Sequence, residues 1–285
     1  MKQFILNKEP GKDNLVRLAG DDYHYLVRVR RLAAGEFFPA LLPNGEETQI
    51  QILSIDGDAL TGKCQQNAKA DVNHSNDCRR VVSSPCEVCH KIILFQALPK
   101  ADKMDLIVRQ AAEGGIAEIV PFVSEFSVAK TNAGGQKYAR WERIIKEARQ
   151  QSGSKIATAL HNPLTTAELL DYWKKLNEGN ASQNSAGAGA MGLLFHHPAP
   201  EFTGAKVLAQ KSLHGYLNSN PGVVALVVGP EGGFSNAEVT LFMENGFNPI
   251  TIGDTVLRTE TAALYCAAAI RVLLLEKNSW ELKKS

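Results

Sequence analysis

The chain has 285 residues, 44% of them hydrophobic, and a formal net charge of +1. This composition excludes a wholly disordered protein, and the charge gives no overall field that would mark a nucleic-acid binder, so any such contact must come from a local basic patch. The sequence has no apolar run long enough to span a membrane and no signal peptide at its start, so we expect a cytoplasmic protein.

Residues 1–75 are typical of a small β-rich domain. Residues 21–36 predict a short helix and a turn. Alternating apolar segments separated by Gly, Asn and Asp turns follow within residues 36–64, a pattern that predicts an antiparallel barrel or sandwich. The polar residues 65–84 predict a linker or an exposed edge.

Cys86, Cys89 and His90 form a C-x-x-C-H pattern, which also occurs at haem attachment sites. Haem attachment of this type requires export, for which the sequence carries no signal. With Cys78 these residues could instead bind zinc, but the usual second ligand pair is absent. We therefore expect ordinary cysteines and no metal site.

Residues 76–285 predict a larger α/β domain, because apolar strands alternate with amphipathic helices, as in a mostly parallel sheet covered on both faces. Asp102 is expected to cap the first helix and Gly114 or Gly115 to end it. Residues 177–190 are small and polar, which predicts a flexible surface insertion. The predicted strands are 91–98, 117–123, 191–197, 223–228 and 248–253, and the predicted helices are 102–115, 138–153, 204–217, 235–245 and 262–276.

The strand at 223–228 ends abruptly in Gly229-Pro230-Glu231-Gly232-Gly233, and Ser235 with Glu238 then forms a capping box for the next helix. The turn lacks the Lys-Ser/Thr of a phosphate-binding loop, and Glu231 would repel a pyrophosphate. An uncharged or positive ligand fits better. A tight turn without any ligand is the alternative explanation.

Another predicted strand ends in Gly253, shortly before a helix that begins near Thr259. Arg258 and Glu260 flank this helix start. A solvated arginine and a glutamate that favours the helix dipole would explain both charges without a site. However, both glycine turns follow the carboxyl ends of strands, where ligands bind in open α/β sheets, so we expect a shared site.

The segments LVVGPEGGFSNAE (226–238) and IGDTVLRTETAA (252–263) closely resemble the signature of SPOUT-class RNA methyltransferases, and within that class the bacterial 16S ribosomal RNA uridine-N3 methyltransferase family. The resemblance extends over nearly the whole chain. Residues 24–36 are similar to the family's PUA-like domain, residues 100–130 to its first helix and the strand that follows, and residues 140–153 to its next helix. It implies a trefoil-knotted α/β domain that binds S-adenosylmethionine.

The resemblance also implies residue roles and partners. Arg258 would stabilise negative charge on a pyrimidine oxygen, and Glu260 would orient Arg258 or accept a proton. The closing helix would form a homodimer, although its apolar run would also suit a core. The RNA-binding residues would be Arg17, His24, Arg28, Arg30 and Arg31, with Tyr23 or Tyr25 for stacking. A solvated charged face would also explain this cluster. The cofactor contacts would be Leu194, His196, Val228, Gly229, Glu231, Gly232, Gly233, Ile252, Gly253, Val256, Leu257 and Thr259.

The chain departs from the family pattern at four positions. The family usually has Arg where this chain has Thr255 and Ser154, Lys where it has Gln110, and Leu where it has Gly114. The positive charges that are missing at these positions are expected near the RNA or cofactor side. The sequence therefore does not identify the target nucleotide. A non-catalytic RNA-binding or ribosome-assembly protein is therefore a second hypothesis. A phosphate-loop nucleotide enzyme is disfavoured by the missing Lys-Ser/Thr.

Overall fold

The chain divides into two compact units. One comprises residues 1–85 with 149–157, and the other comprises residues 86–148 with 158–285. The computed structural model describes residues 4–11, 13–65, 90–100, 102–128, 135–183, 189–196, 211–253 and 255–276.

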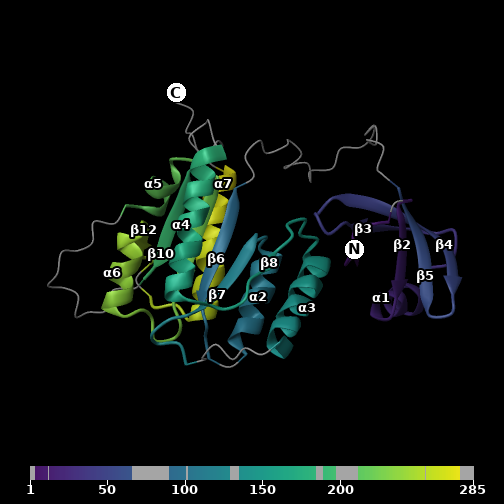
Figure 1. Ribbon diagram of the computed structural model, residues 1–285, viewed down its shortest axis with the longest axis horizontal. Coiled ribbons are helices and arrows are strands. Elements are labelled where there is room, and N and C mark those ends of the chain that lie inside the picture. Colours follow the sequence, from purple (N-terminus) through teal and green to yellow (C-terminus); the bar gives the residue numbers. More distant parts are fainter. Residues whose placement is uncertain are drawn as a thin grey trace. The chain divides into compact units, whose positions relative to one another are not determined.

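The described part of the first unit contains a five-stranded sheet with the order β1-β3-β4-β5-β2 (Figure 1, purple to blue). β1 runs parallel to β3, and the other neighbours are antiparallel. Ile50 and Ile52 point to one face of β4 and pack with Phe38 and Leu26, as the two-residue period of a strand requires. The elements are β1 (Phe4–Ile5), β2 (Leu15–Ala19), α1 (Asp21–Tyr23), the π-helix η1 (His24–Val29), β3 (Phe37–Leu41), β4 (Glu47–Asp56) and β5 (Ala59–Gln65).

The strands predicted within residues 36–64 are confirmed as β3, β4 and β5. The short helix predicted from residue 21 is also present, although most of it is the π-helix η1, in which the Arg30 N–H donates to the Tyr25 carbonyl. The sequence pattern did not indicate β1 or β2. β1 has only two residues, too few to display an alternation.

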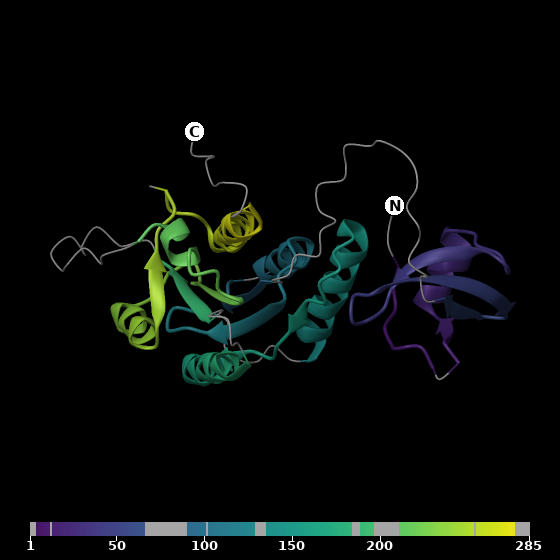
Figure 2. The same ribbon diagram turned by 90° about the horizontal axis from the view of Figure 1, so that it is seen from above.

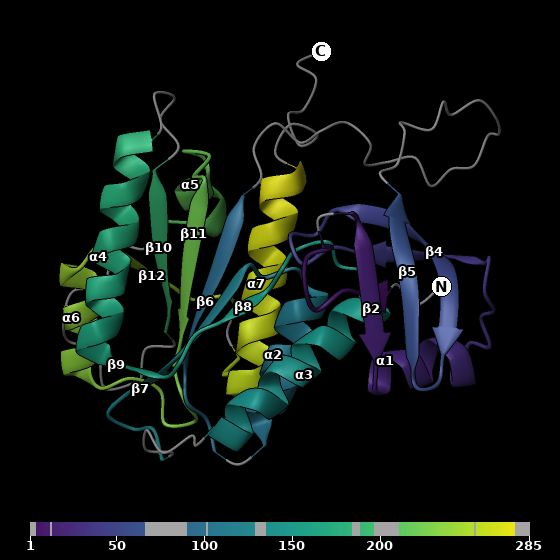
Figure 3. The ribbon, with the colours of Figure 1, turned by 45° about the vertical axis from the view of Figure 1, so that its right-hand side comes forward.

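The second unit is built on a parallel sheet, whose described strands follow the order β12-β10-β11-β6-β7-β8, with β9 also pairing with β7. Figure 3 shows β10, β11 and β6 side by side. The elements are β6 (Lys91–Ala97), α2 (Lys103–Glu113), β7 (Glu118–Val123), α3 (Gly135–Ser152), β8 (Ala159–Leu160), β9 (Leu164–Thr165), α4 (Thr166–Gln183), β10 (Ala190–Phe195), α5 (Leu213–Leu217), β11 (Val223–Val228), α6 (Asn236–Glu244), β12 (Phe247–Ile250) and α7 (Thr259–Glu276).

Every residue of β11 is buried, because helices cover both faces of the sheet (Figure 2). Val224 and Leu226 face a core shared with α2, α3, α5 and α7. Ala225 and Val227 face a second core shared with α4 and α6. The predicted parallel sheet with helices on both faces is therefore confirmed. The chain therefore leaves the buried strand β11 at its carboxyl end, at the edge of the sheet.

The capping box predicted for α6 is confirmed. The Glu238 N–H donates to Ser235 Oγ at 3.3 Å, and the Ser235 N–H donates to a Glu238 carboxylate oxygen at 3.1 Å. The predicted stop is also present, since Gly246 has a φ of 85°, which favours glycine. At α2, Gly114 ends the helix as predicted, but the Asp102 side chain makes no cap hydrogen bond because its backbone is not in the extended conformation of a capping residue.

The predicted flexible insertion at 177–190 is wrong for its first seven residues and its last. α4 continues through Gln183, and β10 begins at Ala190, while residues 184–188 lie outside the described part. The sequence pattern did not indicate α4. Leu169 and Trp173 anchor the helix in the core. Once a helix is nucleated, adding residues that have only a weak helix preference costs little free energy.

Two other predicted boundaries differ from the structure. The helix predicted at 204–217 is described only as the short α5, and residues 204–210 lie outside the described part. The strand predicted at 248–253 is β12, which begins at Phe247 and ends at Ile250. The predicted linker at 65–84 is described only at Gln65, which ends β5.

A cluster of ionisable side chains surrounds the Glu118 carboxylate at the start of β7. Glu118 lies 3.0 Å from His161 Nε2, accepts a hydrogen bond from the Tyr172 hydroxyl and forms an ion pair with Lys91. Burial alone would raise the pKa of this carboxyl, but the hydrogen bonds from its three partners outweigh it and lower the pKa to about 2. The ionised carboxylate therefore stabilises the second unit.

Replacing Glu118 by glutamine is expected to lower the free energy of unfolding by about 1–3 kcal/mol at neutral pH. Because the folded pKa lies below the ordinary value of 4.5, this stabilisation is present above pH 4.5 and is lost as the pH falls toward about 2. Urea unfolding at a series of pH values measures it, with the exposed Glu113→Gln as the control. A deficit that stays constant below pH 4.5 would contradict this account.

Candidate functional site

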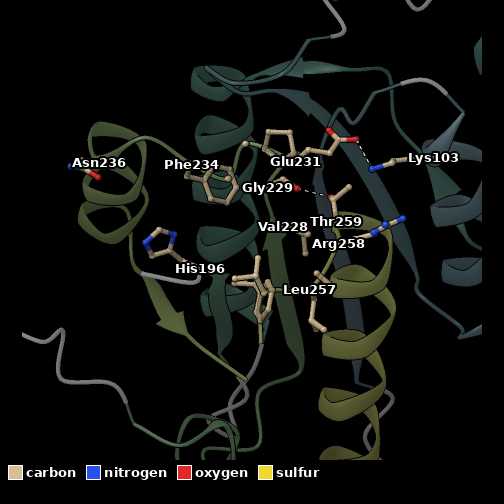
Figure 4. Close-up of a pocket in the computed structure, with 16 residues that line it drawn as sticks. Lys103, His196, Val228, Gly229, Glu231, Phe234, Asn236, Leu257, Arg258 and Thr259 are labelled. Atoms are coloured by element: carbon tan, nitrogen blue, oxygen red, sulfur yellow. Dashed lines mark hydrogen bonds and ion pairs between the residues drawn. The ribbon is translucent and has the colours of Figure 1, made fainter. Parts of the chain in front are cut away.

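A cavity of about 600 Å³ lies at the carboxyl ends of β10 and β11 (Figure 4). This volume lies within the range of pockets that hold small molecules and cofactors. Four segments form its wall: the end of β10, the turn after β11, the residues that lead into α7, and the first residue of α2. The cavity therefore occupies the edge of the sheet at which an open α/β fold binds ligands.

The turn after β11 brings its backbone close to the cavity without side chains in the way. The Gly233 N–H donates to the Pro230 carbonyl at 3.0 Å, and Gly233 has a φ of 70°, in the left-handed region that favours glycine. A Cβ added at Gly229 would lie 3.2 Å from Phe234 Cε2 and 3.3 Å from Gly233 Cα. A ligand in the cavity can therefore be contacted by peptide groups of this turn.

Buried hydrogen bonds tie this turn to the start of α7. The Thr259 hydroxyl donates to the Gly229 carbonyl at 2.6 Å and accepts from Gln96 Nε2 at 3.0 Å. Thr259 and Gln96 are both buried, and Gln96 lies near the end of β6. Buried polar links of this kind fix the relative positions of the groups that they join. The ends of β6 and β11 and the start of α7 thus form one support for the cavity.

The Glu231 carboxylate is held by the protein itself. It accepts hydrogen bonds from the Lys100 N–H at 3.1 and 3.2 Å and forms an ion pair of 2.9 Å with Lys103 Nζ, which Figure 4 shows facing it. Burial would raise the pKa of the Glu231 carboxyl, but the bonds from Lys103 and from backbone N–H groups lower it below its ordinary value. Glu231 is therefore ionised and directed toward Lys103.

Nine of the twelve residues predicted as cofactor contacts line the cavity. The other three lie elsewhere: Leu194 is buried in the core shared with α4 and α6, Ile252 packs against the opposite core, and Gly253 is an exposed bend with a φ of 77°. The residues in the wall are His196, Val228, Gly229, Glu231, Gly232, Gly233, Val256, Leu257 and Thr259.

Of the two residues predicted as catalytic, Arg258 lines the cavity and is exposed. Glu260 lies outside the cavity wall, with its side chain 14% exposed, and its Oε2 is 3.4 Å from Lys103 Nζ. The ion pair that the described residues give to Glu260 is thus with Lys103 and not with Arg258. The described residues therefore do not show Glu260 orienting Arg258, which the sequence had led us to expect.

Lys103 is the main cavity residue that sequence reasoning missed. It is the first residue of α2, directly after the loop that leaves β6. Ligand sites form at the carboxyl ends of strands, and this rule applies to β6 as much as to β11. It could have indicated that the residues after β6 belong to the site. Other wall residues gave no signal in the sequence, because apolar residues at these positions resemble any core residue. They are Phe195, Phe234 and Ala262.

The departures from the family pattern do not fall in the cavity wall. Gln110 and Gly114 line a separate apolar hollow of about 190 Å³ between α2 and α7, and the expectation that the charge lost at Gln110 lies near the RNA or cofactor side stays a prediction. Thr255 is exposed, and the Ser154 N–H donates to Ser152 Oγ. These positions therefore give little support to the hypothesis of a fold without chemistry.

The residues predicted to bind RNA all belong to the first unit. Arg17, His24, Arg28 and Arg31 are exposed, and Arg30 is half-buried. The expectation that Tyr23 could stack on a base is wrong, because this ring is 6% exposed and belongs to the core of the unit. Tyr25 is half-buried and packs against the same core.

The described residues contain no group of three or more His, Cys, Asp and Glu side chains that could hold a metal ion. Cys78, Cys86 and Cys89 lie outside the described part of the chain, and His90 Nδ1 lies 2.8 Å from the Pro221 carbonyl oxygen.

Throughout the described segments, every helix is too short or too polar to cross a membrane.

Two family models match the chain: one for an RNA methyltransferase domain over residues 86–271, and one for an RNA methyltransferase PUA domain over residues 18–63. The ribosomal RNA small subunit methyltransferase E 2 of Borreliella burgdorferi is 28% identical over 98% of this chain and all of its own length. The ribosomal RNA small subunit methyltransferase E of Synechocystis is 28% identical over 91% of this chain and 73% of its own.

The fold is also that of a solved structure, the ribosomal RNA small subunit methyltransferase E of Neisseria gonorrhoeae bound to S-adenosyl methionine. The two chains are 22% identical, with a TM-score of 0.70 over 96% of this chain and 98% of the other.

Proposed function

Because the chain belongs to the RNA methyltransferase family, whose domain model covers residues 86–271, we propose that it transfers a methyl group from S-adenosylmethionine to N3 of a uridine in 16S ribosomal RNA. The observation that carries this proposal is the cavity walled by the turn after β11 and the residues that lead into α7. The relatives named as small subunit ribosomal RNA methyltransferases support the choice of substrate. The trefoil knot stays a prediction.

The volume of the cavity and the polarity of its wall support S-adenosylmethionine as the ligand. Peptide groups of the Gly229–Gly233 turn are accessible for hydrogen bonds to the adenine and ribose, while Phe195, Val256 and Leu257 give apolar wall for the ring. The nearby Glu231 carboxylate, which is paired with Lys103, is compatible with a positive sulfonium. We propose that Leu194, Ile252 and Gly253 support these loops without contacting the cofactor.

S-adenosylmethionine supplies a methyl group on a positively charged sulfur. Uridine N3 must first lose its proton, which we expect the solvent to accept. Its lone pair then forms the new bond to the methyl carbon, and the electrons of the broken carbon–sulfur bond stay on sulfur, so that neutral S-adenosylhomocysteine leaves. We propose that Arg258 stabilises the negative charge that the uracil carbonyl oxygens then carry. Holding N3 in line with the methyl group contributes further. A paired uridine must first be exposed.

We propose that the first unit binds the RNA. The exposed side chains of Arg17, His24, Arg28 and Arg31 supply donors for phosphates, and this role also suits the PUA domain model that matches residues 18–63. Most of these side chains come from η1 and the residues after it, so we expect a local basic patch there in a chain of nearly neutral charge.

We further propose that the protein forms a homodimer through the apolar hollow between α2 and α7. Leu264, Val272 and Leu275 line this hollow and are 40%, 45% and 56% exposed. Aliphatic side chains that line a hollow and remain this exposed are typical of a surface that another chain covers. A second copy is the occupant that the family resemblance implies.

Replacing Val272 by aspartate is expected to convert the dimer to a monomer, because it places an unpaired charge in an apolar interface. Sedimentation velocity of the wild type and the variant measures the change. Leu241→Asp is the matched control, since Leu241 is 39% exposed on α6, away from the hollow. A Val272→Asp protein that sediments as the wild type does would exclude this surface as the interface.

The proposed activity is tested by mass mapping of small subunit ribosomal RNA from cells with and without the gene. We expect one uridine to carry a methyl group on N3 only when the gene is present. Identical modification in both samples would refute the proposal.

A further inference from the structure

Lys103 lies at a position where a lysine is unfavourable for the helix that carries it. As the first residue of α2, it places a positive charge at the positive end of the helix dipole. Its side chain is 32% exposed, so burial of its apolar stem does not explain the position either. What holds the side chain is charge from two other segments of the chain.

Two carboxylates from remote parts of the sequence fix the Lys103 ammonium. Nζ lies 2.9 Å from Oε1 of Glu231, in the turn after β11, and 3.4 Å from Oε2 of Glu260, in the first turn of α7. The hydrogen bond to Glu231 and the charges of both carboxylates raise the pKa of Lys103 above its ordinary value, against a smaller effect of desolvation. Lys103 is therefore protonated at neutral pH.

The fixed position of Lys103 distinguishes it from Arg258, the other cation in the cavity wall. Among the described residues the structure records no ion pair for the Arg258 guanidinium, and this side chain is exposed. A charge that is already in place stabilises a developing charge more effectively than one that must first be ordered. An ammonium also has three N–H donors, and the ion pairs with Glu231 and Glu260 leave at least one of them available.

We propose that Lys103 is a catalytic residue whose ammonium donates to a uracil carbonyl oxygen and stabilises the anion left when N3 loses its proton. In this arrangement Glu231 and Glu260 are positioning residues, which hold the ammonium toward the cavity. Arg258 then donates to the other carbonyl oxygen, so that the two cations together stabilise the negative charge of the imide. This inference rests on the proposed function, because it assigns a role within uridine-N3 methylation.

The test compares Lys103→Gln and Lys103→Arg with the wild type in single-turnover methylation of small subunits that lack the modification. We expect Lys103→Gln to bind S-adenosylmethionine within about threefold of the wild type while its turnover falls about 100-fold. Lys103→Arg should recover much of the loss. Lys174→Gln, which removes an exposed lysine of α4, is the control.

The pH dependence separates a catalytic role from a structural one. If Lys103 stabilises the imide anion, its loss makes N3 harder to deprotonate, so the rise of the rate with pH moves to higher pH and the deficit shrinks there. A structural role would lower the rate by the same factor at every pH. A constant factor, or full turnover in Lys103→Gln, would overturn the proposal.

A double variant deals with the two carboxylates that Lys103→Gln leaves without their cation. Lys103→Gln with Glu260→Gln removes most of their mutual repulsion, and we expect it to remain as slow as Lys103→Gln alone. Recovery of turnover would show that Lys103 only neutralises the carboxylates, which would overturn the inference. Failure of the wild type itself to methylate a uridine would instead refute the proposed function.

Discussion

Arg258→Ala is expected to lose about 100- to 1000-fold in the rate of methyl transfer while binding S-adenosylmethionine nearly as well as the wild type. The side chain lines the cavity but is exposed, so little of the fold depends on it. Its removal takes away a positive charge at the point where we expect the uracil oxygens to become negative. The effect should therefore fall on the chemical step rather than on cofactor affinity.

Single-turnover kinetics and calorimetry with S-adenosylmethionine measure these two quantities separately. Arg258→Lys should retain more activity than Arg258→Ala, because it keeps the charge but loses the planar donors. Arg143→Ala, which removes an exposed arginine of α3, is the control. If Arg258→Ala turned over at the wild-type rate, the assigned role of this residue would be wrong.

Gly229→Val is expected to weaken S-adenosylmethionine binding by about 10- to 100-fold or more. Even the first added carbon would lie 3.2 Å from Phe234 Cε2 and 3.3 Å from Gly233 Cα, which is tighter than most real contacts. The turn must shift, and with it the peptide groups that we expect to contact the cofactor. The Gly229 carbonyl would also lose its alignment with the Thr259 hydroxyl.

Calorimetry measures the affinity, and thermal unfolding establishes that the variant is folded. Gly135→Val is the matched control, because an added Cβ there meets no atom within 4 Å. Wild-type affinity in a folded Gly229→Val protein would show that this turn does not contact the cofactor.

Sequence reasoning was most successful where local chemistry decides the structure. The capping box of Ser235 and Glu238 and the glycine at 246 set the ends of α6 through bonds and φ angles that neighbouring residues alone determine. The continuous apolar run of β11 likewise indicated a strand buried on both faces. These features needed no information about the rest of the chain.

Sequence reasoning was weakest where distant segments decide. α4 extends into a polar stretch because Leu169 and Trp173 anchor it in the core, which the composition of residues 177–183 does not reveal. Lys103 was missed because its significance depends on Glu231 and Glu260, which lie far along the chain. The two glycine turns were identified because each carries its own signal, whereas the charges between them are set by the fold.

The most direct test of the central claim is a crystal structure of the protein with S-adenosylmethionine. We predict that the adenine and ribose lie against the backbone of the Gly229–Gly233 turn and residues 256–259, with the methyl group directed toward the side of the cavity that holds Lys103 and Arg258. Cofactor bound at another place, with this cavity empty at a saturating concentration, would contradict the account.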